Sequence, residues 1–305
     1  MSDLSIPDPN APVYPQALDI QHDTDPAQDH GDARHIPHLG HTALFLAIFG
    51  ISSFLCLLVT LIIGMALHPH AVIPSEPKAL SPTDVHLAGL AQLIAYAITF
   101  AISFLVFPLL WHRSFLNGIS WTFRAARLHW WKLILLGFGL SLLVELSEHF
   151  VKLPKEVELL KMFDTPLIAW LTAISGAFIA PVVEEIAFRG FLLPSIAIAY
   201  DWICLERTPA GYNRWRQTTS NTTPALVLAA VVSSAAFAAL HGFQIHWAFG
   251  VIAGLFVVSL VLSAVRIHFK SVAASTLVHV SYNFLLLLQM VIATHGFRHL
   301  DKLTQ

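Results

Sequence analysis

The sequence predicts an all-α protein that crosses a membrane about seven to eight times as a polytopic helical bundle. Of its 305 residues, 56% are hydrophobic and only 12% are charged, about half the charged fraction of an ordinary soluble domain. Short polar clusters interrupt the apolar sequence at 184–189, 237–241 and 279–283. Charged groups at membrane depth are costly, so such clusters indicate a buried functional site.

The first 40 residues predict a disordered acidic tail. They contain seven aspartates and one arginine, Arg34, with almost no apolar pattern, and such a segment cannot bury enough surface to become ordered. The tail has neither the basic start nor the early apolar core of a cleavable signal peptide. We therefore expect the first membrane helix to serve for targeting.

Seven apolar stretches approach or exceed the length of about 20 residues that crosses a bilayer. They are 41–67, 87–111, 130–147, 166–203, 224–242, 247–265 and 271–293. The fourth is too long for one ordinary crossing and contains Pro181 and Pro194, which allows a long kinked helix or a crossing plus a re-entrant piece. The second alternative raises the number of spans to eight.

The domain organisation follows from these stretches. After the tail of residues 1–40, we expect N-terminal transmembrane helices over 41–163, a core that carries the polar clusters over 164–295, and a short C-terminal tail over 296–305.

The charge distribution bears on orientation and partners. The net charge is −2 and no long basic run occurs, so we expect membrane lipid as a partner and no nucleic acid. Short cytoplasmic loops are rich in Lys and Arg. Seven crossings from a cytoplasmic N-terminus place ten basic residues inside and six outside. We expect a multi-pass protein of a prokaryotic plasma membrane with its N-terminus in the cytoplasm.

The first polar cluster combines two carboxylates with an arginine. Residues four apart share one face of a helix, so Glu185 and Arg189 can pair while Glu184 points about 100° away. A nearby guanidinium favours the charged form of Glu185, which leaves Glu184 as the better candidate for a general base. The alternative is a cluster of salt bridges at the membrane edge.

The other two clusters supply imidazoles and an amide. His241 ends an apolar helix four residues after Phe237, where a satisfied interfacial histidine is the alternative to a catalytic one. His279 and Asn283 share one face in the middle of a leucine-rich helix. Aligned donors in a dry site can stabilise a developing oxyanion, and the alternative is a polar clamp between helices.

The three clusters together resemble a known signature. Glu-Glu-x-x-x-Arg, Phe-x-x-x-His and His-x-x-x-Asn, in this order on three apolar segments, resemble the motifs of the CPBP (Abi, CAAX-protease-like) intramembrane proteases. The stretch 181–191 is especially similar to the first motif of that family. The resemblance covers about residues 165–290 and leaves the first three spans outside it.

This resemblance implies a helical bundle with a conical catalytic cavity in the membrane, open to the cytosol and the bilayer. The implied activity is that of an intramembrane endopeptidase. The six motif residues take three pairs of roles, namely water activation by Glu184 and His241, oxyanion binding by His279 and Asn283, and support by Glu185 and Arg189.

The expected substrate is a membrane-associated or lipidated protein or peptide, with CAAX-type processing as the implied reaction in the family. Aromatic residues next to the motifs are the candidates for holding its apolar portion. These substrate-cavity candidates are Phe188, Phe191, Phe237 and Phe243.

We expect no cofactor. The sequence lacks His-Glu-x-x-His, and its two cysteines, Cys56 and Cys204, are too few for a thiolate metal site. The alternative is a zinc ion, because two histidines and a glutamate form a plausible ligand set. Those ligands are Glu184, His241 and His279.

Two other functions use the same polar residues. One is a catalytically silent membrane protein of the binding or immunity type, in which the clusters serve packing and partner recognition. The other is a proton-coupled transporter, in which intramembrane Glu and His relay protons. The transporter is disfavoured because no internal repeat with matched broken helices is visible.

Overall fold

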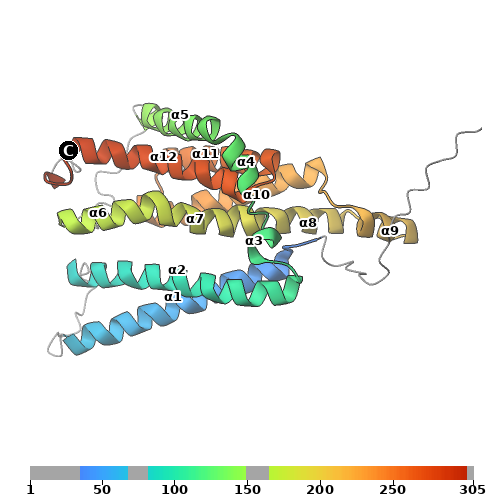
Figure 1. Cartoon of the computed structure of the whole chain (residues 1–305), viewed down its shortest axis with the longest axis horizontal. Helices are drawn as coiled ribbons and strands as arrows, with labels where there is room; N and C mark the ends of the chain where they lie inside the picture. Colours follow the sequence, from blue (N-terminus) through green and yellow to red (C-terminus); the bar gives the residue numbers. More distant parts are fainter. Residues whose placement is uncertain (1–34, 68–81, 149–164, 301–305) are drawn as a thin grey trace, which may run out of the picture. The chain divides into compact units, whose positions relative to one another are not determined.

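The protein is all-α in the ranges that its structure, a computed structural model, describes. These ranges are residues 35–67, 82–148 and 165–300, and they contain helices and no strand. The helices are α1 (Leu39–Leu67), α2 (Pro82–Trp111), α3 (Phe115–Gly118), α4 (Phe123–Leu128), α5 (Trp130–Glu148), α6 (Pro166–Ile174), the π-helix η3 (Ser175–Ile179), α7 (Ala180–Glu185), the π-helix η4 (Ile186–Leu192), α8 (Leu193–Ile203), α9 (Pro209–Gln217), α10 (Thr223–Leu240), the 3₁₀-helix η5 (Gly242–Ile245), α11 (Phe249–Phe269) and α12 (Val272–Ala293) (Figure 1). Most of the predicted acidic tail lies outside the described residues.

Six helical stretches are long and apolar enough to cross a membrane. They are Leu39–Ala66, Leu87–Trp111, Pro166–Ile203, Thr223–Leu240, Phe249–Phe269 and Val272–Ala293. Each coincides with a predicted span, so the protein is an integral, multi-pass membrane protein. The remaining predicted span, α5, packs alongside α12, and its crossing stays a prediction.

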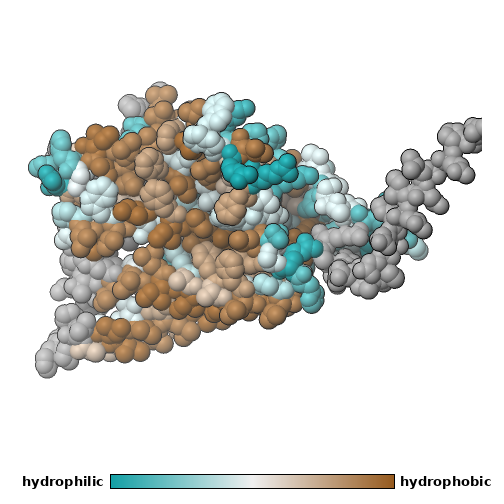
Figure 2. All heavy atoms as spheres, viewed as in Figure 1, coloured by the Kyte–Doolittle hydropathy of each residue, from teal (hydrophilic) through white to brown (hydrophobic). Residues whose placement is uncertain are grey.

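The surface of the bundle agrees with a lipid environment. Large apolar side chains such as Phe54, Leu105 and Leu109 are exposed on α1 and α2, and brown apolar groups cover most of the face seen in Figure 2. Continuous apolar surface of this extent is rare on soluble monomers. Lipid solvates it without a penalty.

The long fourth stretch forms one continuous helical run from Pro166 to Ile203. This result favours the kinked helix over the crossing with a re-entrant piece. Pro181 and Pro194 each follow a π-helical segment, η3 and η4 respectively. A proline lacks an N–H and its ring collides with the carbonyl one turn earlier, and a π-turn widens the helix at that point. We call this run, 166–203, the motif helix, because Glu184 and Glu185 lie in α7 between the two widened segments.

An aromatic cluster joins the N-terminal helices to the motif helix. Phe45 of α1 stacks on Phe191 of η4 with ring centroids 4.4 Å apart, and Phe107 of α2 lies 5.0 Å from the same ring. Trp111 and Phe115 complete the cluster, whose members are all buried. The predicted N-terminal unit is therefore packed directly against the segment that follows the two glutamates.

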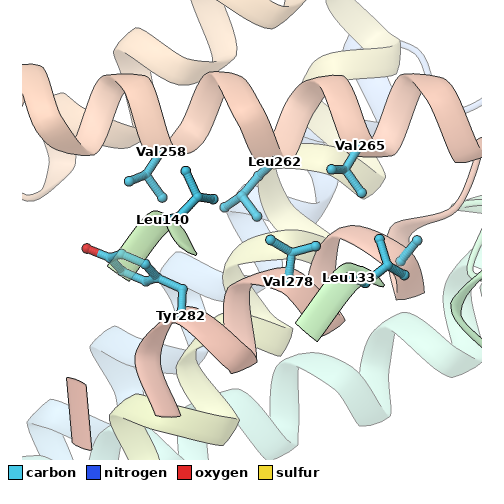
Figure 3. Packing of buried hydrophobic residues seen from close by; sticks show 8 residues of the cluster. Leu133, Leu140, Val258, Leu262, Val265, Val278 and Tyr282 are labelled. Atoms are coloured by element: carbon cyan, nitrogen blue, oxygen red, sulfur yellow. The ribbon is translucent and has the colours of Figure 1, made fainter. Parts of the chain in front are cut away.

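A second core joins α5, α11 and α12. Figure 3 shows Val258 and Leu262 of α11 facing Val278 of α12, with Leu133 and Leu140 from α5 completing the layer. This packing fixes the position of α12, which carries the third polar cluster.

One residue of the predicted C-terminal tail packs against the bundle. Phe297, which we placed in the C-terminal tail, is buried and its ring meets Trp170 of α6 edge-on at a centroid distance of 5.1 Å. Residues 301–305 lie outside the described ranges. The second residue of the predicted tail therefore packs against the first helix of the motif helix, α6.

Candidate functional site

A buried ion pair forms the centre of the site. Arg189 Nη1 lies 2.9 Å from Glu185 Oε1, and both side chains are 0% exposed. The spacing of four residues brings the two side chains together, as it predicts for a helix. A fully buried pair exists only where further hydrogen bonds support it, and the neighbouring helices provide them.

His279 of α12 stands between the two glutamates. Its Nδ1 lies 3.0 Å from Glu185 Oε1, and its Nε2 lies 3.7 Å from Glu184 Oε2. An ionised carboxylate only accepts hydrogen bonds, so Nδ1 donates to Glu185. This bond orients the imidazole, in the way that partners of catalytic and ligating histidines do.

The two glutamates differ in accessibility. The side chain of Glu184 is 27% exposed, whereas that of Glu185 is fully buried. Glu184 is therefore the carboxylate that an incoming molecule can reach, and Glu185 is the one committed to internal partners.

His241 joins the site through an aromatic ring. It follows the last turn of α10, and its Nδ1 lies 2.9 Å from the carbonyl oxygen of Phe237. The Phe237 ring lies 4.7 Å from the imidazole of His241 and 5.9 Å from that of His279, measured between centroids. Phe237 thus bridges two histidines that are far apart in sequence.

The register of α10 against the motif helix explains the depth of His241. At one end Thr222 N donates to Asp201 Oδ2 at 3.0 Å, and the two helices run antiparallel from that point (Figure 1). Glu184 precedes Asp201 by nearly as many residues as His241 follows Thr222. Because the two packed helices have a similar rise, we expect His241 to lie near the level of Glu184.

Asn283 lies one turn beyond His279 on α12. Its Nδ2 donates to the carbonyl oxygen of Gly176 at 2.9 Å. Gly176 belongs to η3, so the amide ties α12 to the π-helical segment that precedes α7. In this structure Asn283 serves at least as a connection between the two motif-bearing helices.

The four aromatic candidates separate into two groups. Phe188 and Phe237 meet edge-on at 5.2 Å beside the Arg189 guanidinium, whose Cζ lies 5.8 and 5.1 Å from their rings. Phe191 instead packs in the aromatic cluster with α1 and α2. Phe243, on the turn after His241, is 78% exposed.

Sequence reasoning missed two residues of α11 that hold Arg189. Arg189 Nη2 donates to the carbonyl oxygen and to Oγ of Ser259, at 2.9 and 2.7 Å. Arg266 Nε donates to the backbone carbonyl of Arg189 at 3.2 Å. The available signal was a polar stripe at helical spacing, formed by Ser259, Ser263 and Arg266 in an otherwise apolar helix.

The zinc alternative finds no ready ligand set here. In the ranges that the structure describes, no three His, Cys, Asp or Glu side chains gather closely enough to hold a metal ion. Glu184, His241 and His279 therefore do not form one ligand group in these ranges.

The fold and the site together define a polytopic membrane protein with a buried Glu–Arg–His cluster. Residues 166–285 match the family described as type II CAAX prenyl endopeptidase Rce1-like. The match supports, for this segment, the CAAX-protease-like (CPBP) family of membrane proteases that the three motifs predict. The match begins at the first residue of α6 and ends within α12. Neither the curated proteins nor the solved structures gave a match to the chain.

Proposed function

We propose that this protein is an intramembrane endopeptidase in which Glu184 and His241 activate a water molecule. The observation that carries the proposal is the division of labour between the two glutamates on either side of His279. Glu185 is buried and its Oε1 is bonded to both Arg189 and His279, whereas Glu184 is partly exposed. One carboxylate orients the site and the other is available for chemistry.

The reaction follows from these positions. The oxygen of a water attacks the scissile carbonyl carbon while Glu184 takes a proton, and the carbonyl becomes a tetrahedral oxyanion. The C–N bond then breaks, the proton passes to the leaving nitrogen, and the products are a carboxylic acid and an amine. General base catalysis of this kind contributes about 10²- to 10⁴-fold, and His241, at the same depth, is the partner for the water.

We assign the binding of this oxyanion to two residues of α12, His279 and Asn283. Nε2 is the ring nitrogen of His279 that lies near Glu184, 3.7 Å from its Oε2. Asn283 presents its amide one turn further along α12. Donation to the oxyanion requires a proton on both ring nitrogens of His279, with Nδ1 held by Glu185. Preorganised donors of this kind cost no rearrangement during the reaction.

The proposed substrate is a membrane-associated protein or peptide with an apolar or lipidated end, processed in the CAAX manner of the family. Phe188 and Phe237 lie beside the charged cluster and Phe243 is exposed next to His241, so these rings are the proposed contacts of the apolar portion. In this proposal Phe191 supports the scaffold, because it is fully enclosed by the aromatic cluster.

The test uses the purified full-length protein in lipid nanodiscs and an internally quenched peptide ending in a farnesylated Cys-a-a-X sequence. We expect cleavage by the wild type and a loss of at least about 100-fold in kcat for Glu184→Gln. Glu206→Gln is the matched control, because the Glu206 side chain is 61% exposed and pairs with Arg214 on the surface. Normal turnover by Glu184→Gln would overturn the assignment, and a wild type inert toward farnesylated and unmodified peptides would favour the catalytically silent alternative.

A further inference from the structure

The backbone of η4, directly after Glu185, is bonded by side chains from three other helices. Carbonyl groups at membrane depth need internal partners, and a π-turn displaces the ordinary helical bonds. The three bonds join Ser233 Oγ to the carbonyl of Phe188 at 3.4 Å, Arg266 Nε to that of Arg189 at 3.2 Å, and Thr42 Oγ1 to that of Phe191 at 3.3 Å. The shape of η4 therefore depends on α10, α11 and α1.

Arg266 is the charged member of these three donors, and its helix contacts Arg189 at two points. Ser259, two turns before Arg266 on the same face of α11, accepts both bonds from the Arg189 guanidinium. Arg266 binds the backbone of the same residue. Because α11 holds both ends of Arg189, it fixes the direction in which the guanidinium reaches Glu185.

The charges around the site indicate a second role for Arg266, the compensation of negative charge. Glu184 and Glu185 are adjacent, Arg189 pairs with Glu185, and Arg266 is bonded to the backbone of Arg189. Two carboxylates are thus matched by two guanidinium groups. An uncompensated carboxylate inside a membrane bundle is strongly unfavourable. Arg266 therefore supplies the second positive charge, which Arg189 alone does not provide.

We infer that Arg266 is a further positioning residue of the candidate site. By holding the Arg189 carbonyl, it fixes η4 and so maintains the contact of Glu185 with His279. The inference rests on the proposed function for its kinetic readout but not for its structural one. The competing explanation is that Arg266, near the end of α11, only contributes a positive charge to the cytoplasmic side.

Two substitutions separate these explanations. Arg266→Met keeps the length of the side chain and removes its charge and donors, whereas Arg266→Lys keeps the charge but not the guanidinium geometry. Arg127→Met is the control, because Arg127 is an exposed arginine in the last turn of α4. Hydrogen exchange of the amides in η4 and α6 is measured in nanodiscs, together with kcat and KM for the farnesylated peptide.

For Arg266→Met we expect exchange in η4 to rise about tenfold or more, the effect of losing one charge-assisted bond, with α6 unchanged. The kcat should fall by at least the same factor with little change in KM, and Arg266→Lys should recover only part of both effects. Unchanged exchange in η4, a general rise that includes α6, or full recovery by lysine would each overturn the inference. If the wild type does not cleave the peptide, the proposed function fails alone, and the exchange data still decide the role of Arg266.

Discussion

Two Glu–Arg pairs in this protein have opposite surroundings. Glu185 and Arg189 are fully buried at 2.9 Å, whereas Glu206 and Arg214 have side chains that are 61% and 67% exposed. Water screens the exposed pair, so its contribution to stability is about 0–1 kcal/mol. The buried pair has no such screening, and removing one partner leaves an unpaired charge inside the bundle.

We therefore predict that Glu185→Gln lowers the free energy of unfolding by roughly 3 kcal/mol or more. Arg189 loses its countercharge, and the partner of His279 Nδ1 changes from a carboxylate to a neutral amide. Unfolding of the purified protein by SDS in mixed micelles measures the change, with Glu206→Gln as the control. Equal stability of the two variants would show that Glu185 does not have the structural role assigned here.

A second prediction at this scale concerns metal. Under the proposed mechanism Glu184 activates water directly, so a membrane-compatible chelator should leave cleavage of the farnesylated peptide within about twofold of its starting rate. Restoration of a lost activity by added zinc would instead support a metal site. The control is a chelator already saturated with zinc, which separates metal removal from any effect of the reagent on the bilayer.

The spacing of residues on single helices was predictable, and contacts between helices were not. The Glu185–Arg189 pair follows from four-residue spacing on one helix. The bond from His279 to Glu185 joins α12 to α7, and the bonds from Ser259 and Arg266 join α11 to η4. Such contacts depend on crossing geometry and on the π-turns, and the local sequence does not encode either one.

At the scale of elements, close helix packing lies where no motif marked it. A Cβ added at Gly137 of α5 would lie 2.5 Å from the carbonyl oxygen of Val278 and 2.6 Å from Cβ of Ser281, so α5 touches α12 backbone to backbone. Gly250 and Gly254 form a Gly-x-x-x-Gly sequence in α11, which is typical of close helix contacts, yet a Cβ added at Gly254 would meet no atom within 4 Å. The glycine that permits the close contact is therefore Gly137, which lies in no such sequence.

We predict that Gly137→Ala destabilises the protein by about 1–3 kcal/mol, the range for overpacking a filled contact. Gly139→Ala, on the same helix, is the matched control, because a Cβ there meets nothing within 4 Å. In that position alanine should be neutral or stabilising by up to about 1 kcal/mol, owing to its better helix propensity. Thermal unfolding in detergent compares the two variants, and equal midpoints would contradict the close approach of α5 and α12.

At the scale of the whole bundle, several contacts tie one end together. Ser271 Oγ donates to the carbonyl of Thr122 at 2.6 Å, which joins the turn between α11 and α12 to the segment before α4. His35, just before α1, stacks on Trp215 of α9 at 3.8 Å. These contacts pair the start of α1 with α9, and the segment that includes α3 and α4 with the turn at 270–271. Seven crossings from a cytoplasmic N-terminus would place all four segments on the cytoplasmic side.

That end carries most of the basic residues, including Arg207, Arg214 and Arg216 around α9. The positive-inside rule predicts that this end lies in the cytoplasm. Phe191 packs near the start of α1 and the end of α2, which both lie at this end of the bundle. Glu184 lies about two turns before Phe191 on the motif helix. We therefore predict that the site is in the cytoplasmic half of the bilayer.

Single cysteines at 212 and 78 test this orientation. Tyr212 lies on α9, and residue 78 lies between α1 and α2 in a segment outside the described ranges. The background must lack both native cysteines, because Cys204 is exposed close to α9. In intact cells a membrane-impermeant maleimide should label position 78 and leave position 212 unlabelled until the membrane is permeabilised. Labelling at 212 but not at 78 would invert the bundle, and substrates would then reach Glu184 from the outer face.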